Sequence, residues 1–350
     1  MPTVTTPNSN NVSQTLIDEG QFLNLSRFQP ELFAQALTFA LSNQTKVSIR
    51  APGIIMFEPP AIGDKDIVLS SGIHGNETAP IEICDAFVQG ILRGEIVLAN
   101  RVLFLFGNLP AMNVAKRFIE ENLNRLFSGA HSVANAVANA ECVRAKELEV
   151  AVSEFFLAHT GRERIHYDLH TAIKPSKNDK FAVYPFRHER PWNKQQLAFL
   201  LACGINTILL SGSATTTFSY YSSNQFQAEA FTVELGKVFP FGENDMSQFE
   251  ALKAALHHLL CGEELSLKPF NNDDFLIYQV NQVINKHSEA FRFTFSDDVA
   301  NFSDFGKNHL LATDGDERYY CEYEGEAIVF PNEKVAIGQR AVLTVIPTKI

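Results

Sequence analysis

Residues 67–77 read Ile-Val-Leu-Ser-Ser-Gly-Ile-His-Gly-Asn-Glu, and they join a short apolar run to a glycine turn. The run 67–70 has the length of a buried strand, and a helical pattern follows at 80–91. In α/β sheets, ligands bind beside the turns that follow the strands. This stretch therefore predicts an α/β fold and puts His74 and Glu77 at a candidate site.

The same alternation continues along the chain. Further strand-like runs lie at 102–106, 165–169, 181–184, 207–210 and 231–233, and helical patterns lie at 133–157 and 249–260. Short buried strands that alternate with helices predict a sheet covered on both faces. After residue 265, strand-like runs follow one another with polar turns between them, which is typical of an all-β module. We expect an α/β domain at 1–264 and a smaller all-β domain at 265–350.

The composition narrows the class of protein. Of 350 residues, 45% are hydrophobic and 20% are charged, as in soluble globular proteins. Forty acidic residues against 29 basic ones give a net charge of −11, which argues against nucleic-acid binding. No apolar run reaches the ~18 residues that span a bilayer, and the first residues lack a signal-peptide pattern. We expect a cytoplasmic protein without a membrane partner, whose five widely spaced cysteines are free thiols.

Ionisable residues follow three of the strand-like runs. His74 and Glu77 follow the first run, His170 follows 165–169, and Glu234 follows 231–233. Two imidazoles and one carboxylate leave one tetrahedral position of zinc open for water, which is the catalytic arrangement. We expect one zinc per chain, with Glu234 as the separate carboxylate that deprotonates the water and passes the proton to the leaving amine.

Each ligand also has an ordinary structural explanation. His74 fits a loop histidine, Glu77 fits a carboxylate that caps the next helix, and His170 fits a satisfied core histidine. Glu234 is harder to explain, because a carboxylate between Val233 and Leu235 is costly unless it is paired or functional.

A fourth segment carries cations and an amide. Arg117 and Arg125 have guanidinium forks that suit carboxylates, and Asn124 adds an amide donor. The alternative is a solvated helix face on which Glu120 and Glu121 neutralise both arginines.

Five motifs, in order, are SGIHGNETAP, GNLPAMNVAKRF, NLNRLF, YDLHT and FTVELGKVFPFGEND. Together, over about residues 68–245, they resemble the succinylglutamate desuccinylase and aspartoacylase family of zinc carboxypeptidase-like hydrolases. The resemblance implies a mixed sheet flanked by helices, and it implies zinc held by His74, Glu77 and His170. It also implies that Glu234 is the general acid and base.

The resemblance implies roles for the fourth segment as well. Arg117 matches the arginine that polarises the scissile carbonyl, and Asn124 and Arg125 match the pair that grips a substrate carboxylate. The stretch after Glu234 is similar to the branch that hydrolyses N-succinyl-L-glutamate to succinate and L-glutamate in arginine degradation. We therefore expect a small anionic N-acyl amino acid as the substrate. N-succinyl-L-glutamate has three carboxylates. We therefore expect further cations to bind it, and the candidates are Lys174, Lys180, Arg187 and Lys237.

Other functions remain open at this point. They are an aspartoacylase-like amidohydrolase, a peptide-cleaving carboxypeptidase, and an inactive zinc-binding scaffold whose β module recruits a partner. The charges of Glu141, Arg144 and Glu147 are expected on a solvated or salt-bridged helix face. Adjacent His257 and His258 point apart on a helix, so we do not expect them to share a metal.

Overall fold

The computed structural model describes residues 9–133 and 139–350, and the chain forms two compact units. The first unit contains the residues up to His170 together with Thr215–Thr232 and Val238–Lys268, and the second contains Thr171–Ala214, Val233–Lys237 and Pro269–Ile350. Strand β9 (Glu229–Lys237) therefore begins in the first unit and ends in the second. The division of the sequence at residue 264 stays a prediction.

A mixed sheet forms the centre of the first unit. Its strands are, in spatial order, β1 (Leu37–Ala40), β2 (Lys46–Ala51), β3 (Ile54–Glu58), β5 (Arg101–Phe106), β4 (Lys65–Ser71) and β6 (Glu163–Ala172). Strand β4 pairs in parallel with β5 and β6, whereas β1, β2, β3 and β5 pair antiparallel in that order. The register sets Ser70 beside Asp168 and Ser71 beside Leu169. The carboxyl ends of β4 and β6 therefore meet at one edge of the sheet, as the candidate site requires.

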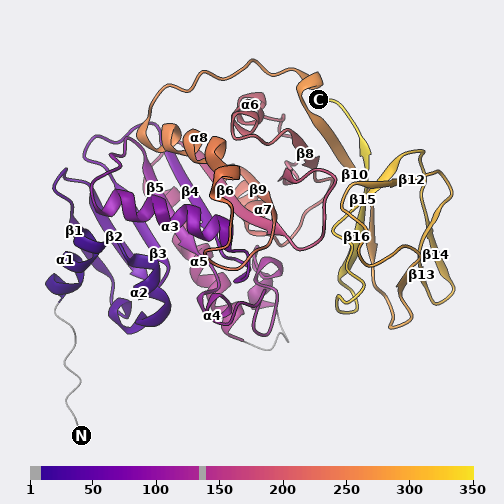
Figure 1. Cartoon of the computed structure of the whole chain (residues 1–350), viewed down its shortest axis with the longest axis horizontal. Coiled ribbons are helices and arrows are strands. Elements are labelled where there is room, and N and C mark those ends of the chain that lie inside the picture. The colour runs from indigo at the N-terminus through magenta and orange to yellow at the C-terminus, as the bar shows by residue number, and fades with distance from the viewer. Residues whose placement is uncertain (1–8, 134–138) are drawn as a thin grey trace, which may run out of the picture. The chain divides into compact units, whose positions relative to one another are not determined.

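Helices cover this sheet (Figure 1). They are α1 (Ser9–Glu19), α2 (Phe22–Phe28), α3 (Thr78–Leu92), α4 (Leu109–Asn113), α5 (Ala140–Leu157), α7 (Phe218–Phe226) and α8 (Glu250–Cys261), with 3₁₀ turns η1 (Pro30–Phe33), η2 (Leu123–Arg125), η3 (Ala130–Ser132) and η4 (Met246–Phe249). Val68 and Leu103 belong to the same apolar core as Ala145 and Leu148 of α5. Because neighbouring strand residues point to opposite faces, Ile67 lies on the other side of the sheet.

The start of α5 differs from the prediction. A helix was expected from residue 133, but Val133 is not helical and α5 begins at Ala140; residues 134–138 lie outside the described residues. The physical reason is a cap, because the Asn139 side chain accepts a hydrogen bond from the backbone N–H of Cys142 at 2.8 Å.

The second unit has its own strands. In spatial order they are β7 (Lys180–Tyr184), β8 (Thr207–Leu210), β10 (Leu276–Asn285), β16 (Arg340–Pro347), β15 (Glu326–Val329) and β12 (Ser303–Phe305), and a three-stranded sheet contains β11 (Arg292–Phe293), β13 (Leu310–Asp314) and β14 (Glu317–Tyr320). Helix α6 (Lys194–Ala202) and turn η5 (Asn272–Asp274) complete it. From β10 onward the structure is all-β, with a core that includes Phe291, Leu311 and Val342. The predicted fold class, a mixed α/β sheet followed by an all-β region, is confirmed.

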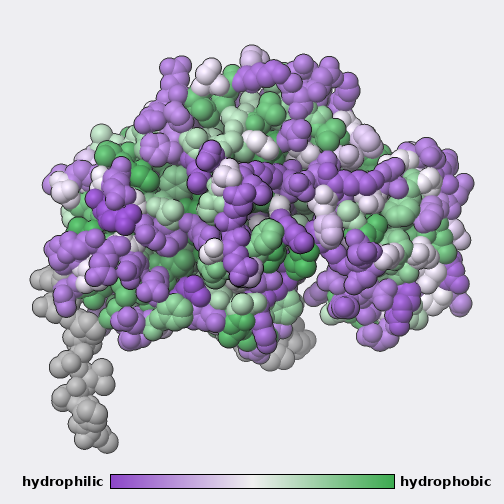
Figure 2. Space-filling model, viewed as in Figure 1, coloured by the Kyte–Doolittle hydropathy of each residue, from purple (hydrophilic) through white to green (hydrophobic). Residues whose placement is uncertain are grey.

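The surface agrees with the composition. Figure 2 shows a face on which hydrophilic residues predominate and apolar residues are scattered among them. All five cysteines are free thiols, as predicted. Within the described ranges, the helices are too short or too polar to cross a membrane.

Candidate metal centre

Glycines shape the turn that carries His74. Gly72 has a φ of +64°, in the left-handed region that favours glycine. At Gly75 a Cβ would lie 2.3 Å from the backbone of Ala111 and Met112, so only glycine lets this turn approach α4 so closely. The turn between β4 and α3 is therefore held against α4.

The structure brings His74, Glu77 and His170 together, as predicted. One ligand atom from each lies within 4.8 Å of the others. Nδ1 of His74 is 2.9 Å from Oε1 of Glu77, and Nδ1 of His170 is 2.9 Å from Oε2. All three residues are buried, with 3%, 1% and 2% of their surface exposed.

Hydrogen bonds on the far side of each ring determine which nitrogen carries the proton. Oδ1 of Asn122 accepts from the backbone N–H of Asn124, so it is an acceptor, and Nε2 of His74 must donate to it at 2.9 Å. In the same way, Nε2 of His170 donates to a carboxylate oxygen of Asp168 at 2.9 Å. A neutral imidazole has one N–H, so with both rings neutral, as metal binding requires, each Nδ1 presents a lone pair toward Glu77.

Lone pairs that face carboxylate oxygens repel one another unless a cation lies between them. Nδ1 of His74 is accordingly a buried nitrogen without a hydrogen-bond partner among the described residues, although Glu77 is close. Two imidazole nitrogens and a carboxylate are a ligand set of catalytic zinc sites. The residues therefore fit a zinc ion.

The pKa values of the three groups also indicate that a positive charge stabilises this cluster. Burial, together with Arg117, lowers the pKa of His74 to about 4, so this ring is neutral at pH 7. Burial acts to raise the pKa of Glu77, but His74, Arg117 and His170 hold it well below its usual range. Burial also acts to lower the pKa of His170, yet Asp168 and Glu77 raise it well above the usual value. In the metal-free protein, a proton on His170 takes the place of a cation.

Two of the structural explanations for these residues are not supported. Glu77 precedes α3, but its carboxylate points to His74, His170 and Arg117 instead of capping the helix. His74 is not an ordinary loop histidine, because it is 3% exposed. Asn122 and Asp168, which orient the two rings, were missed by the sequence analysis.

Arg117, Asn124 and Arg125 also lie close to one another. Nη1 of Arg117 is 2.5 Å from Oε1 of Glu77, and Nη1 of Arg125 donates to the carbonyl of Asn124 at 3.0 Å. Burial, and then the charge of Arg117, lowers the pKa of Arg125 to about 10. Residues 113–116 and 118–120 are exposed, as the solvated alternative expected, but Arg117 does not lie on a helix. Among the described residues Glu121 bonds to Asn139, whereas Arg117 pairs with Glu77. Guanidiniums suit an anionic ligand.

Glu141 holds this segment in place, which the sequence analysis missed. Its Oε1 accepts from the backbone N–H of Ile119 at 2.7 Å and from the amide of Asn108 at 3.1 Å. Glu141 is 2% exposed, so the expected solvated face is wrong at this position. The salt-bridged alternative holds for Arg144, which pairs with Glu147. Glu141 lies in the first turn of α5, but the predicted helix began at residue 133, so its place at a helix start was hidden.

The remaining predicted residues belong to the second unit. Glu234 lies on β9 and is 6% exposed, and its catalytic role stays a prediction. Lys174 forms an ion pair with Asp297 at 2.7 Å, and Lys237 is exposed.

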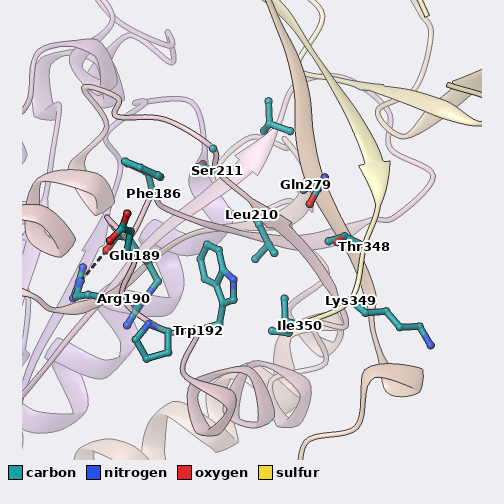
Figure 3. A pocket seen from close by; sticks show the side chains of 14 residues that line it. Phe186, Glu189, Arg190, Trp192, Leu210, Ser211, Gln279, Thr348, Lys349 and Ile350 are labelled. Atoms are coloured by element: carbon teal, nitrogen blue, oxygen red, sulfur yellow. Dashed lines mark hydrogen bonds between the residues drawn. The ribbon is translucent and has the colours of Figure 1, made fainter. Parts of the chain in front are cut away.

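Arg187 lines a cavity of about 590 Å³ within the second unit (Figure 3). Its guanidinium stacks on the ring of Tyr184 at 4.8 Å, and Trp192 packs against the same ring at 4.9 Å. Arg190 and Gln279 also line the cavity. This mixture of cations and aromatic rings suits an anionic molecule with an apolar part.

A second group of possible ligands lies at the end of α8. His257, Cys261 and Glu263 offer ligand atoms within 4.8 Å of one another, and His258 does not belong to this group. The side chains of His257 and Glu263 are 41% and 50% exposed.

Comparisons with known proteins show which family this chain resembles over its length. Residues 63–260 match the model of the succinylglutamate desuccinylase/aspartoacylase catalytic domain, and residues 273–348 match that of the AstE/AspA barrel-sandwich hybrid domain. Succinylglutamate desuccinylase of Pseudoalteromonas atlantica is 60% identical over 99% of both chains.

Two solved structures are similar to this chain over most of its length. Succinylglutamate desuccinylase of Chromobacterium violaceum has a TM-score of 0.82 at 37% identity, covering 94% of this chain and 98% of that one. The Vibrio parahaemolyticus protein has a TM-score of 0.83 at 34% identity, covering 94% and 95%.

Proposed function

The chain belongs to the succinylglutamate desuccinylase/aspartoacylase family, and from this premise we propose that it hydrolyses N-succinyl-L-glutamate to succinate and L-glutamate. One observation carries the proposal: two buried imidazoles aim their Nδ1 atoms at the carboxylate of Glu77, with their Nε2 atoms bonded to Asn122 and Asp168, an arrangement that fits a zinc ion. The relatives that match over nearly the whole chain are named for this reaction.

In this reaction water adds to the amide carbon and the C–N bond breaks. Zinc held by His74, Glu77 and His170 would supply Lewis acidity, which lowers the pKa of water and polarises a carbonyl. Glu234 takes a proton from the attacking water and returns it to the leaving nitrogen of glutamate. The atoms balance without any other reactant.

The arginine segment binds and orients the substrate. Arg117, which lies against the metal ligand Glu77, donates to the oxygen on which negative charge develops. Arg125 and Asn124 bind a carboxylate of the substrate. The amide orientation of Asn124 supports this role, because its Oδ1 accepts from the backbone N–H of Phe218 and leaves the NH₂ group as the donor.

A turnover panel tests the proposal. The acyl part and the amino-acid part are varied separately, using N-succinyl-glutamate, N-acetyl-glutamate and N-acetyl-aspartate, before and after chelation and again after zinc is restored. We expect the highest kcat/KM for N-succinyl-glutamate and lower kcat for the truncated acyl group, since remote binding energy orients the scissile amide. Faster turnover of N-acetyl-aspartate would contradict the assignment of the substrate.

A further inference from the structure

A chain of buried polar side chains extends from His170 into the first unit. Beyond Asp168 it contains Ser70 on β4, His166 on β6 and Ser222 on α7. His166, Asp168 and His170 alternate along β6, so all three point to the same face. The register of β4 and β6 places Ser70 directly beside Asp168.

The donor and the acceptor of each hydrogen bond in this series of side chains can be assigned. Ser70 donates to Oδ1 of Asp168 at 2.5 Å, which uses its only proton. The contact of 2.8 Å between Ser70 and Nε2 of His166 must then be a donation by the imidazole. Burial lowers the pKa of His166 to about 4, so the ring is neutral and has a single N–H. Its Nδ1 therefore accepts from the hydroxyl of Ser222 at 2.7 Å.

Helix α7 is held in place at its start and again one turn further along. At its start, the backbone N–H of Phe218 donates to Asn124 at 3.1 Å. The ring of Phe218 packs edge-on against His166, with centroids 4.8 Å apart. Ser222, one turn along, is thereby held within reach of the imidazole. Helix α7 therefore contacts Asn124 of the arginine segment and also His166, which belongs to the series of side chains that leads to His170.

We propose that Ser70, His166 and Ser222 are positioning residues for the zinc ligand His170. With one oxygen of Asp168 fixed by Ser70, the other oxygen is aimed at Nε2 of His170, which keeps the proton there and the lone pair on Nδ1. His74 has a different support, the amide of Asn122 in a partly buried loop. The inference rests on the proposed zinc site but concerns residues for which the reaction itself has no use.

A purely structural role makes a different prediction. If the chain only satisfied buried polar groups, its removal would destabilise the fold without changing how the protein holds zinc. A matched control is available on the same helix. Ser219 is buried and its hydroxyl bonds to Thr232 at 2.7 Å, outside this chain. Ser219→Ala therefore removes one buried hydroxyl from α7 but leaves the support of His170 intact.

The first experiment measures the rate at which zinc passes to a chromophoric chelator. Loss of a group that orients a metal ligand typically costs about 10–100-fold in affinity, so Ser70→Ala should release zinc faster by that factor. Ser222→Ala should have a smaller effect of the same sign, and Ser219→Ala should match wild type. His166→Gln should retain zinc better than His166→Leu, because Gln keeps an N–H donor near Ser70.

The second experiment uses ¹⁵N NMR of the histidines in the metal-free protein. We expect His166 to carry its proton on Nε2 in wild type. A proton on Nδ1 would overturn the proposal, as would zinc release from Ser70→Ala and His166→Leu at the rate of Ser219→Ala. If Ser70→Ala does not fold, His166→Leu and Ser222→Ala carry the test. A wild-type protein that binds zinc without hydrolysing any acyl amino acid would contradict the proposed function but not this inference.

Discussion

Two groups of possible metal ligands lie in the described part of the first unit, and they differ in burial, in the segments that supply them and in one residue type. His74, Glu77 and His170 are at most 3% exposed, and their side chains come from two segments that the sheet brings together. His257 and Cys261 are one turn apart on α8, and with Glu263 they lie at the surface.

The supporting contacts explain what the difference means. Each buried imidazole has a hydrogen-bond acceptor on its far side that leaves a lone pair for the metal. In the exposed group, partial burial and then Glu263 raise the pKa of Cys261, so a metal displaces the proton of this thiol at a greater cost than usual. Local spacing therefore does not make a metal site; burial and orientation do.

Removal of a buried ligand gives the largest expected effect. His74→Ala or His170→Ala should lose nearly all zinc and activity, because two ligands in a buried polar cavity cannot hold the ion. His257→Ala is the matched control and should keep one zinc per chain. Metal analysis after gel filtration measures both. Full zinc occupancy in His74→Ala and His170→Ala would break the comparison.

Glu234→Gln should separate zinc binding from chemistry. The amide has nearly the same size but does not take a proton from water, so kcat should fall by about 10²–10⁴-fold while zinc content stays at wild type. Steady-state kinetics and metal analysis on the same sample measure this. Activity within a few-fold of wild type would place the general base elsewhere.

The sequence revealed the ligands themselves for a physical reason. His74 follows the continuous apolar run of 67–69 with a glycine turn between them, and His170 follows a strand-like run that itself contains His166 and Asp168, so both histidines stand beside a predicted strand. Strands β5 and β8 were predicted to within one residue because they are short and uniformly buried, and β4 was predicted to within two residues at either end.

The support of those ligands could not be predicted, because it depends on pairing. Ser70 meets Asp168 only through the register of β4 and β6, which no local pattern encodes. Helix α7 was not predicted, since its sequence FSYYSSNQF buries serines and lacks a clear apolar stripe. Ser222 and His166 were therefore invisible as a pair.

The two arginines should differ in which kinetic constant they change. Arg125→Ala should mainly raise KM and Arg117→Ala should mainly lower kcat, each by about 10–100-fold, the equivalent of the roughly 1.5–3 kcal/mol of a hydrogen bond to a charged group. Zinc content should be unchanged in Arg125→Ala. Steady-state kinetics with N-succinyl-glutamate distinguishes the two effects. Equal changes in both constants for both variants would remove the distinction.

Zinc affinity should depend on pH through His170. Burial acts to lower its pKa, but Asp168 and Glu77 raise it well above the usual value in the metal-free protein, so zinc must displace a proton. Below that raised pKa, affinity should increase by about tenfold per pH unit. The same shift stabilises the metal-free fold fully below the unfolded pKa, and this contribution is lost as pH rises through the folded pKa.

Calorimetry in buffers of different ionisation enthalpy measures the proton that is released when zinc binds. A zinc affinity that does not change between pH 6 and 8 would show that His170 is already neutral in the metal-free protein.

The smallest effect is expected at the exposed group. Cys261→Ala removes a thiol whose pKa is raised by burial and then by Glu263, and which therefore has little thiolate to offer a metal at neutral pH. Its neighbours His257 and Glu263 are about half-exposed, so water competes with them as a ligand of any ion, and their side chains lose rotamer freedom when they bind one.

The Cys261→Ala variant should keep wild-type kcat/KM, and its free energy of unfolding should change by no more than about 0.5 kcal/mol, as for other surface substitutions. After dialysis, wild type and Cys261→Ala should both hold one zinc per chain. A second zinc equivalent in wild type that is missing from Cys261→Ala would show that exposure does not prevent this group from binding metal, and the contrast drawn between the two groups would be wrong.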